Sequence, residues 1–128
     1  FVVRVAGNVL ATSTMASLQY AVHFLKVKVL LVLGHELCGA VKAAQLPSDH
    51  VEQEPKELSN ALRGIKRNIG QGKLQGAEDH RMLDREALTI DTKRQMETIA
   101  EDEGIMGNRA ESCWWWAAST RSPAASST

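Results

Sequence analysis

A nearly unbroken apolar run, Val27 to Leu33, lies in the first third of the chain and ends at Gly34. Apolar strands of this kind are usually covered on both faces, as they are in a parallel sheet. The chain begins with a second short run rich in β-branched residues, Phe1 to Ala6, which predicts another strand ended by Gly7 and Asn8. Two such strands favour a parallel sheet if helices connect them.

Helical periodicity lies between and after these two runs. Between them, apolar residues recur at helical spacing and predict an amphipathic helix of about three turns. These residues are Met15, Leu18, Val22 and Leu25. Residues 39–44 are predicted to start a further helix, and apolar spacing predicts helices over 58–69 and 81–100 after a polar loop at 46–55. The alternation predicts an α/β fold, with an open, mainly parallel sheet flanked by helices.

Composition and charge narrow the possible partners. The 128 residues fit one domain, and 15 Lys and Arg balance 15 Asp and Glu. Without a basic excess, nothing supports binding to nucleic acid or to a membrane surface. The run Val29 to Leu33 is far shorter than the ~20 residues of a membrane span. Since no signal peptide is visible, we expect a cytoplasmic protein with neither nucleic-acid nor membrane partners.

The strongest local feature is the segment 34–39, with the sequence GHELCG, where a predicted strand is followed by a predicted helix. His35 and Cys38 lie three positions apart, and imidazole nitrogen and thiolate sulfur are ligands that Zn²⁺ prefers. Active sites of open α/β sheets lie at the carboxyl ends of strands. The pattern therefore suggests a metal site, although two ligands are fewer than the three of a catalytic zinc. The alternative is a packed histidine next to a small buried cysteine.

Four blocks of the sequence resemble the β-class carbonic anhydrases, in the same order and at similar spacing. The blocks are FVVRVAGN (1–8), SLQYAV (17–22), LKV (25–27) and VLGHELCGAV (32–41). Together they cover the first third of the chain. The predicted helices that follow are compatible with this family but are not diagnostic of it.

The resemblance implies an α/β zinc enzyme, a homodimer or higher homo-oligomer, that hydrates carbon dioxide to bicarbonate and a proton. The family holds Zn²⁺ with two cysteines and one histidine, and His35 and Cys38 match the second and third ligands. Gly39 matches a position against the metal site, where a small residue leaves room for substrate. Tyr20 matches a cleft-lining position, or is an ordinary core aromatic. Arg4 matches a position linked to bicarbonate binding in one subgroup, although a surface or interface ion pair is favoured.

One motif of the family is absent from the 128 residues. The motif Cys-x-Asp-x-Arg supplies the first zinc thiolate and lies upstream of the strand that begins at Phe1. We therefore expect that residues preceding Phe1 belong to the protein, and that residues 1–112 form a partial β-carbonic-anhydrase-like domain, incomplete at its N-terminus. The chain alone is expected to bind zinc weakly and to have little or no activity.

Two alternatives belong to other functional classes. The first is a non-catalytic relative that keeps the fold and acts as a structural or interaction protein. The second is a nucleotide- or anion-binding module, which is disfavoured because the chain has no Gly-x-Gly-x-x-Gly or Walker-type loop. Zinc content and carbon dioxide hydration would separate these possibilities.

Residues 113–128 differ in composition from the rest of the chain. They contain all three tryptophans, Trp114 to Trp116, followed by a segment almost entirely of Ala, Ser, Thr and Pro. We interpret them as an atypical low-complexity tail. Tryptophan has the single codon TGG, so a reading one base earlier turns Cys113 to Ala117 into Leu-Val-Val-Gly whatever codons are used. Since β-class carbonic anhydrases typically end in a strand like Val-Val-Gly-Gly-Val-Tyr, the tail is hypothesised to be a frameshift product of that strand.

Overall fold

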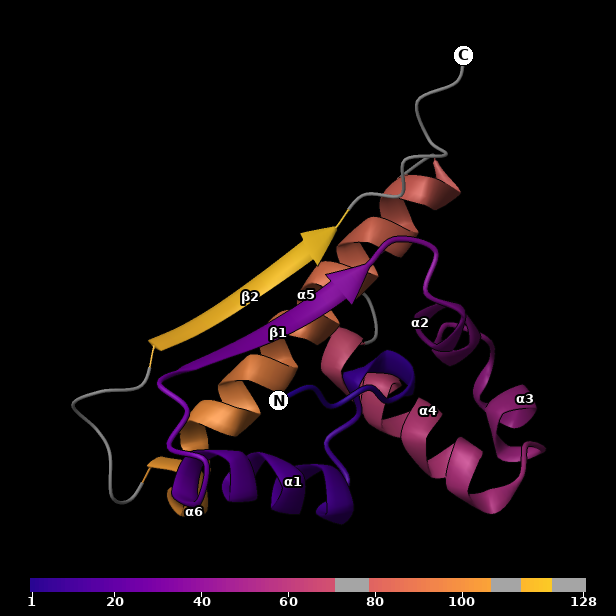
Figure 1. Ribbon diagram of the computed structural model, residues 1–128. Helices are drawn as coiled ribbons and strands as arrows, with labels where there is room; N and C mark the ends of the chain where they lie inside the picture. The colour runs from indigo at the N-terminus through magenta and orange to yellow at the C-terminus, as the bar shows by residue number, and fades with distance from the viewer. Residues whose placement is uncertain (71–78, 107–113, 121–128) are drawn as a thin grey trace.

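The computed structural model describes residues 1–70, 79–106 and 114–120 (Figure 1). In chain order the elements are the 3-10 helix η1 (Ala6–Asn8), helix α1 (Thr12–His23), strand β1 (Val29–His35), helices α2 (Gly39–Ala44), α3 (Ser48–Glu52), α4 (Lys56–Ile69), α5 (His80–Glu101) and α6 (Glu103–Met106), and strand β2 (Trp114–Thr120). The helices predicted over 39–44, 58–69 and 81–100 are confirmed as α2, α4 and α5. None of the helices in these ranges is long and apolar enough to cross a bilayer.

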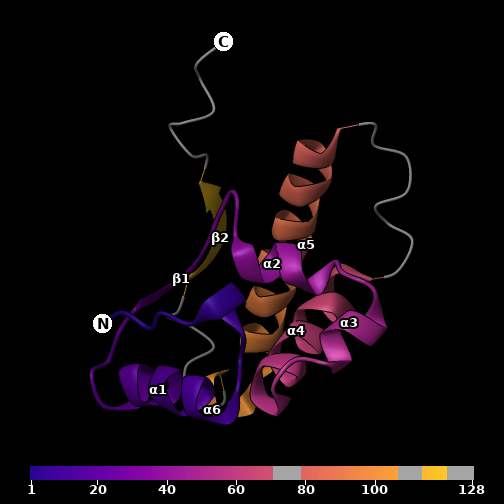
Figure 2. The ribbon, with the colours of Figure 1, turned by 90° about the vertical axis from the view of Figure 1, so that its right-hand side faces the viewer.

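The two strands form a parallel sheet, in which Val29 is opposite Trp114 and His35 is opposite Thr120. Helix α5 runs along one face of both strands, as Figures 1 and 2 show. Leu30 and Val32 of β1 pack towards the helices. The side chains that alternate with them, Val29, Leu31 and Leu33, remain 59%, 57% and 49% exposed. The α/β class is confirmed, and in the described part of the chain the helices cover one face of the sheet.

Two apolar clusters make up the core. The larger one joins α2, α3, α4 and α5 through Val41, Ala44, Val51, Leu62, Ile65, Ile69, Ala87 and Leu88. The smaller one joins α1, α5 and α6 through Val22, Ile99 and Ile105. Burial of these side chains, rather than helix propensity, supplies most of the stability of short helices such as α2 and α3.

The structure corrects two predicted elements and moves one boundary. The strand predicted over residues 1–6 is wrong, because residues 1–5 join no strand ladder and Ala6 begins η1. A β-branched run becomes a strand only where a neighbouring strand lies within pairing distance. The predicted polar loop over 46–55 contains α3, whose Val51 is buried in the larger cluster. Strand β1 also continues through Gly34 to His35.

The C-terminal segment contributes to the sheet. Residues 114–120, part of the predicted low-complexity tail, form β2 beside β1. Cys113 and residues 121–128 lie outside the described residues, as do residues 71–78 of the glycine-containing linker. The domain boundary between residues 112 and 113 and the frameshift stay predictions.

Candidate functional site

The segment from His35 to Gly39 connects the end of β1 to the start of α2, as predicted. Leu37 within it adopts a left-handed backbone conformation, with φ of 60°. Residues other than glycine reach this region at a cost of roughly 1–2 kcal/mol. Cys38 precedes the helix, and its carbonyl accepts a hydrogen bond from the Lys42 N–H at 3.0 Å. The turn therefore stores local strain between the two candidate zinc ligands.

The ring of His35 has one nitrogen engaged and the other available. Its Nδ1 lies 3.1 Å from the carbonyl oxygen of Glu36. A carbonyl can only accept, so the neutral ring must carry its proton on Nδ1 to make this bond. That tautomer leaves the Nε2 lone pair for a metal, which is the usual arrangement of a zinc-bound histidine. Cys38 has a free, half-buried thiol.

His35 and Cys38 line the same cavity, which has a volume of about 670 Å³. Its walls are formed mainly by residues 1–5, by β1, and by Leu88, Asp91, Gln95 and Ile99 of α5. Both predicted ligands thus line one cavity, His35 as the last residue of β1 and Cys38 as the residue before α2. Among the described residues, no group of three His, Cys, Asp or Glu side chains could hold a metal ion. The pair matches zinc in ligand type, but a third ligand would have to come from outside those residues.

The other predicted site residues lie in different surroundings. Gly39 is exposed, and a Cβ atom there would have nothing within 4 Å. In the described part of the chain Gly39 is not among the residues that line the cavity. Arg4 is exposed and lines the cavity. Tyr20 is 49% exposed and stacks on Phe24 with ring centroids 5.1 Å apart. In the part of the chain that is described, the Tyr20 side chain is not among those that line the cavity.

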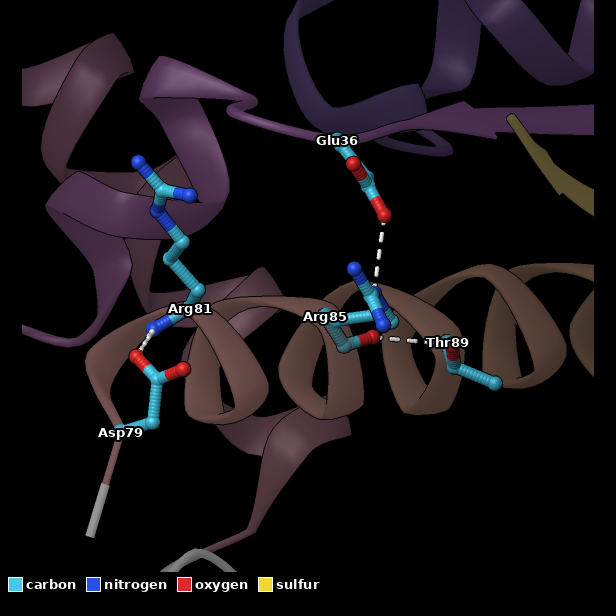
Figure 3. Close-up of polar contacts among 5 residues, drawn as sticks. All are labelled: Glu36, Asp79, Arg81, Arg85 and Thr89. Atoms are coloured by element: carbon cyan, nitrogen blue, oxygen red, sulfur yellow. Dashed lines mark hydrogen bonds and ion pairs between the residues drawn. The ribbon is translucent and has the colours of Figure 1, made fainter. Parts of the chain in front are cut away.

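An ion pair ties the connecting segment to α5 (Figure 3). Arg85 Nε donates to Glu36 Oε1 at 2.8 Å, and the Glu36 side chain is only 11% exposed. The first turn of α5 is capped by Asp79, which accepts from the Arg81 N–H at 2.9 Å. Further along, Thr89 Oγ1 donates to the Arg85 carbonyl at 2.8 Å. Sequence reasoning missed this pair, because nothing in the local pattern connects residues 49 positions apart.

A separate polar group of α5, centred on Asp91, lines the cavity. Asp91 is 2% exposed and lines the cavity together with Gln95. Its Oδ1 accepts from Asn68 Nδ2 at 2.8 Å and from Gln95 Nε2 at 3.3 Å. Burial raises the pKa of the Asp91 carboxyl, and the two hydrogen bonds partly oppose the rise. The sequence analysis did not single out Asp91, which lies within a predicted amphipathic helix.

Comparison with known sequences identifies relatives. A family model described as carbonic anhydrase matches residues 1–112. A carbonic anhydrase of Mycolicibacterium smegmatis is 50% identical over 52 residues, which are 41% of this chain and 25% of that protein. Carbonic anhydrase 2 of Mycobacterium tuberculosis is 52% identical over 44 residues, 34% of this chain and 21% of that protein. The chain thus matches between 21% and 25% of the length of these two relatives.

Solved structures show the same fold. The β-carbonic anhydrase CcaA superimposes with a TM-score of 0.80 at 19% identity, covering 94% of this chain and 62% of that one. A Coccomyxa β-carbonic anhydrase, solved in complex with acetazolamide, gives a TM-score of 0.75 at 24% identity, covering 86% and 50%. These similarities confirm the predicted α/β architecture.

Proposed function

Because the chain belongs to the β-class carbonic anhydrases, we propose that it supplies two zinc ligands to an enzyme that reversibly hydrates carbon dioxide to bicarbonate and a proton. The main support is that His35, at the carboxyl end of β1, and Cys38, at the start of α2, line the same cavity. This edge is where open α/β sheets bind their ligands.

In this proposal His35 Nε2 and Cys38 Sγ hold the zinc. When bound, zinc lowers the pKa of its water to about 7 and so makes hydroxide available at neutral pH. The hydrogen bond to the Glu36 carbonyl keeps the His35 ring in the tautomer that leaves Nε2 free. Cys38 binds as a thiolate, so its thiol must lose a proton when the metal enters.

The surroundings of the ligands suit a small, uncharged substrate. Gly39, the residue after Cys38, has no side chain, and a Cβ atom there would have nothing within 4 Å. Apolar residues of β1, including Val32, line the cavity next to the ligands. Arg4 lines the cavity, but a surface or interface ion pair stays its favoured role. Tyr20 does not line the cavity in the described part of the chain, and a cleft-lining role for it in the whole protein stays a prediction.

The alternative is a non-catalytic relative that keeps the fold. It is favoured by one observation, namely that the described residues contain no group of three potential metal ligands. We accordingly expect weak zinc binding and little activity from the 128-residue chain by itself. A cytoplasmic location is part of the proposal and is tested by cell fractionation.

Zinc content and carbon dioxide hydration, measured on the same sample, separate the two functions. Elemental analysis after dialysis against zinc gives the bound metal, and stopped-flow pH-indicator assays give the hydration rate. Zinc that is retained and lost on chelation supports the enzyme's metal site, even where hydration by this chain is slow. A chain that retains no zinc and gives no rate above the buffer contradicts the enzyme and supports the scaffold.

Self-association is the second part of the proposal. The exposed face of β1 presents Val29, Leu31 and Leu33 to solvent. Tyr20 of α1 and Phe24, which directly follows that helix, are also exposed, at 49% and 74%. Since parallel sheets are normally covered on both faces, we propose that a second copy of the chain covers this face.

A further inference from the structure

We propose that the ion pair between Glu36 and Arg85 is a positioning device, which holds the turn that sets His35 and Cys38 relative to each other. The inference rests on the proposed function, since it concerns how the two zinc ligands are kept in place. Neither residue is proposed to touch the metal or the substrate. Arg85 acts through Glu36, and Glu36 acts through the backbone between the two ligands.

The turn needs an external restraint, because its own conformation is unfavourable. Leu37 has a φ of 60° and a side chain that is 70% exposed, so packing of Leu37 does not compensate for the strained backbone. Strained residues persist only where the surrounding structure over-determines them. On one side, Cys38 is fixed by the Lys42 N–H bond at the start of α2. On the other side, Glu36 is held by Arg85.

Burial makes this ion pair different from an ordinary surface pair. The Glu36 side chain is 11% exposed and its partner Arg85 is 47% exposed, whereas both partners of the Arg94–Glu97 pair on the same helix are about half exposed; the difference lies in the carboxylate. Exposed pairs contribute little because water screens them and their side chains lose entropy. Removing Arg85 takes away one charge partner of a carboxylate that is itself largely desolvated. We expect the Glu36 side chain, and the turn with it, to be held less firmly.

A neighbouring contact shows that α5 restrains both ends of this region. Gln45, at the end of α2, donates to Asp84 Oδ1 at 3.0 Å. Asp84 and Arg85 are adjacent on α5. Arg85 contacts Glu36, which directly precedes the strained Leu37, and Asp84 contacts Gln45, which directly follows α2. Helix α5 thereby fixes the position of the whole segment from Glu36 to Gln45.

The experiment compares Arg85→Gln with Arg94→Gln. Both variants replace an ion-paired arginine of α5 by the same residue, and only the first removes the Glu36 contact. A Cys113→Ser background leaves Cys38 as the one thiol, and its rate of alkylation by iodoacetamide in the metal-free chain reports opening of the turn. We expect Arg85→Gln to accelerate alkylation, Arg94→Gln to leave it at the parent rate, and Arg85→Lys to restore part of the protection. Circular dichroism verifies that each variant is folded.

Cobalt(II) binding then tests the effect on ligand geometry. The parent is expected to show thiolate–cobalt absorption, and Arg85→Gln to raise the dissociation constant by about 10-fold and shift the visible bands, as loss of an outer-shell partner does. The proposal is overturned if alkylation of Arg85→Gln matches the parent, or if alkylation changes while the cobalt affinity of a metal-binding parent does not. A parent without cobalt absorption contradicts the proposed zinc site, and alkylation alone then decides on the ion pair.

Discussion

A Cβ atom on Gly34 would lie 2.4 Å from Thr92 Oγ1, so β1 and α5 approach each other here more closely than any side chain on Gly34 allows. The same Cβ would lie 3.0 Å from Leu88 Cδ1. Because Gly34 directly precedes His35, this contact sets how deeply the end of β1 sits on α5. The position of the candidate metal site therefore depends on a glycine that carries no chemistry itself.

Replacement of Gly34 by alanine tests that contact. We expect Gly34→Ala to lower the free energy of unfolding by about 1–3 kcal/mol, the usual cost of overpacking a tight contact. Gly64→Ala is the matched control, since a Cβ there has nothing within 4 Å and the position is interior to α4. The free energy of unfolding of this control should rise by about 0.5–1 kcal/mol, because alanine is favoured over glycine inside a helix. Urea unfolding measures both, and equal stabilities of the two variants would contradict the close approach.

The buried carboxyl of Asp91 should make the free energy of unfolding depend on pH. Burial raises the pKa of its carboxyl above the usual 3.8. The native chain therefore keeps this proton at pH values where the unfolded chain has lost it. The contribution of this group to the free energy of unfolding falls as pH rises from 3.8 through the raised native pKa. Urea unfolding over a pH series measures the slope.

The variant Asp91→Asn isolates this contribution. Its amide oxygen can accept the bonds from Asn68 and Gln95, and the side chain carries no charge. We expect the variant to be more stable than the parent at neutral pH, and the difference to shrink in acid. Parent and variant curves that run parallel over the whole series would rule out Asp91 as the source.

The two proposed zinc ligands are tested by removing them singly. His35→Ala and Cys38→Ser should each weaken zinc binding by more than the about 10-fold that loss of an outer-shell partner costs. Competition with a chromophoric chelator measures the affinity. His50→Gln is the control, because His50 is exposed on α3 and is not a proposed ligand. Acid should weaken binding by the parent, since the cysteine must lose its proton and the histidine must stay neutral. If His35→Ala and Cys38→Ser both bind zinc as tightly as the parent and the control do, the metal lies elsewhere.

Self-association is tested on the exposed face of β1. We expect the parent to have the mass of a dimer or larger oligomer, and Leu31→Lys to shift it towards the monomer, because a charge would then be buried between copies. Leu58→Lys is the control, since Leu58 is an exposed leucine on α4 rather than on the sheet. Light scattering coupled to size-exclusion chromatography gives the mass. A parent that is monomeric at every concentration contradicts the proposed interface.

The coding DNA tests the origin of the C-terminal segment. Read one base earlier, Cys113 to Ala117 would encode Leu-Val-Val-Gly, and the hypothesis is that residues from about Cys113 onward are a frameshift product. We expect a gained or lost base near the Cys113 codon when independent copies of the gene are sequenced. Three intact TGG codons in the same frame in every copy would refute the hypothesis.

Hydrophobic periodicity and side-chain chemistry were sufficient to predict much of the fold and of the candidate site. The spacing of Leu62, Ile65 and Ile69 predicted α4, because a helix must turn its apolar residues to one side whatever it packs against. His35 and Cys38 were candidates for zinc binding because affinity for the metal is a property of the side chains themselves. The step from strand to helix between them followed from a change of period at Gly34.

Tertiary structure decided what depends on distant partners. Residues 1–5 have a strand-like sequence but join no ladder, since pairing needs a neighbour that local sequence does not specify. The sequence could not predict that Arg85 pairs with Glu36 or that Asn68 bonds to Asp91. A helix carries many similar polar side chains, and only tertiary packing determines which of them meets a given partner. Side-chain type and period are local, and sequence was therefore enough to predict α1, α2, α4, α5 and the two candidate ligands. Pairing, burial and close approach are relations between separated segments, so only the folded chain decided them.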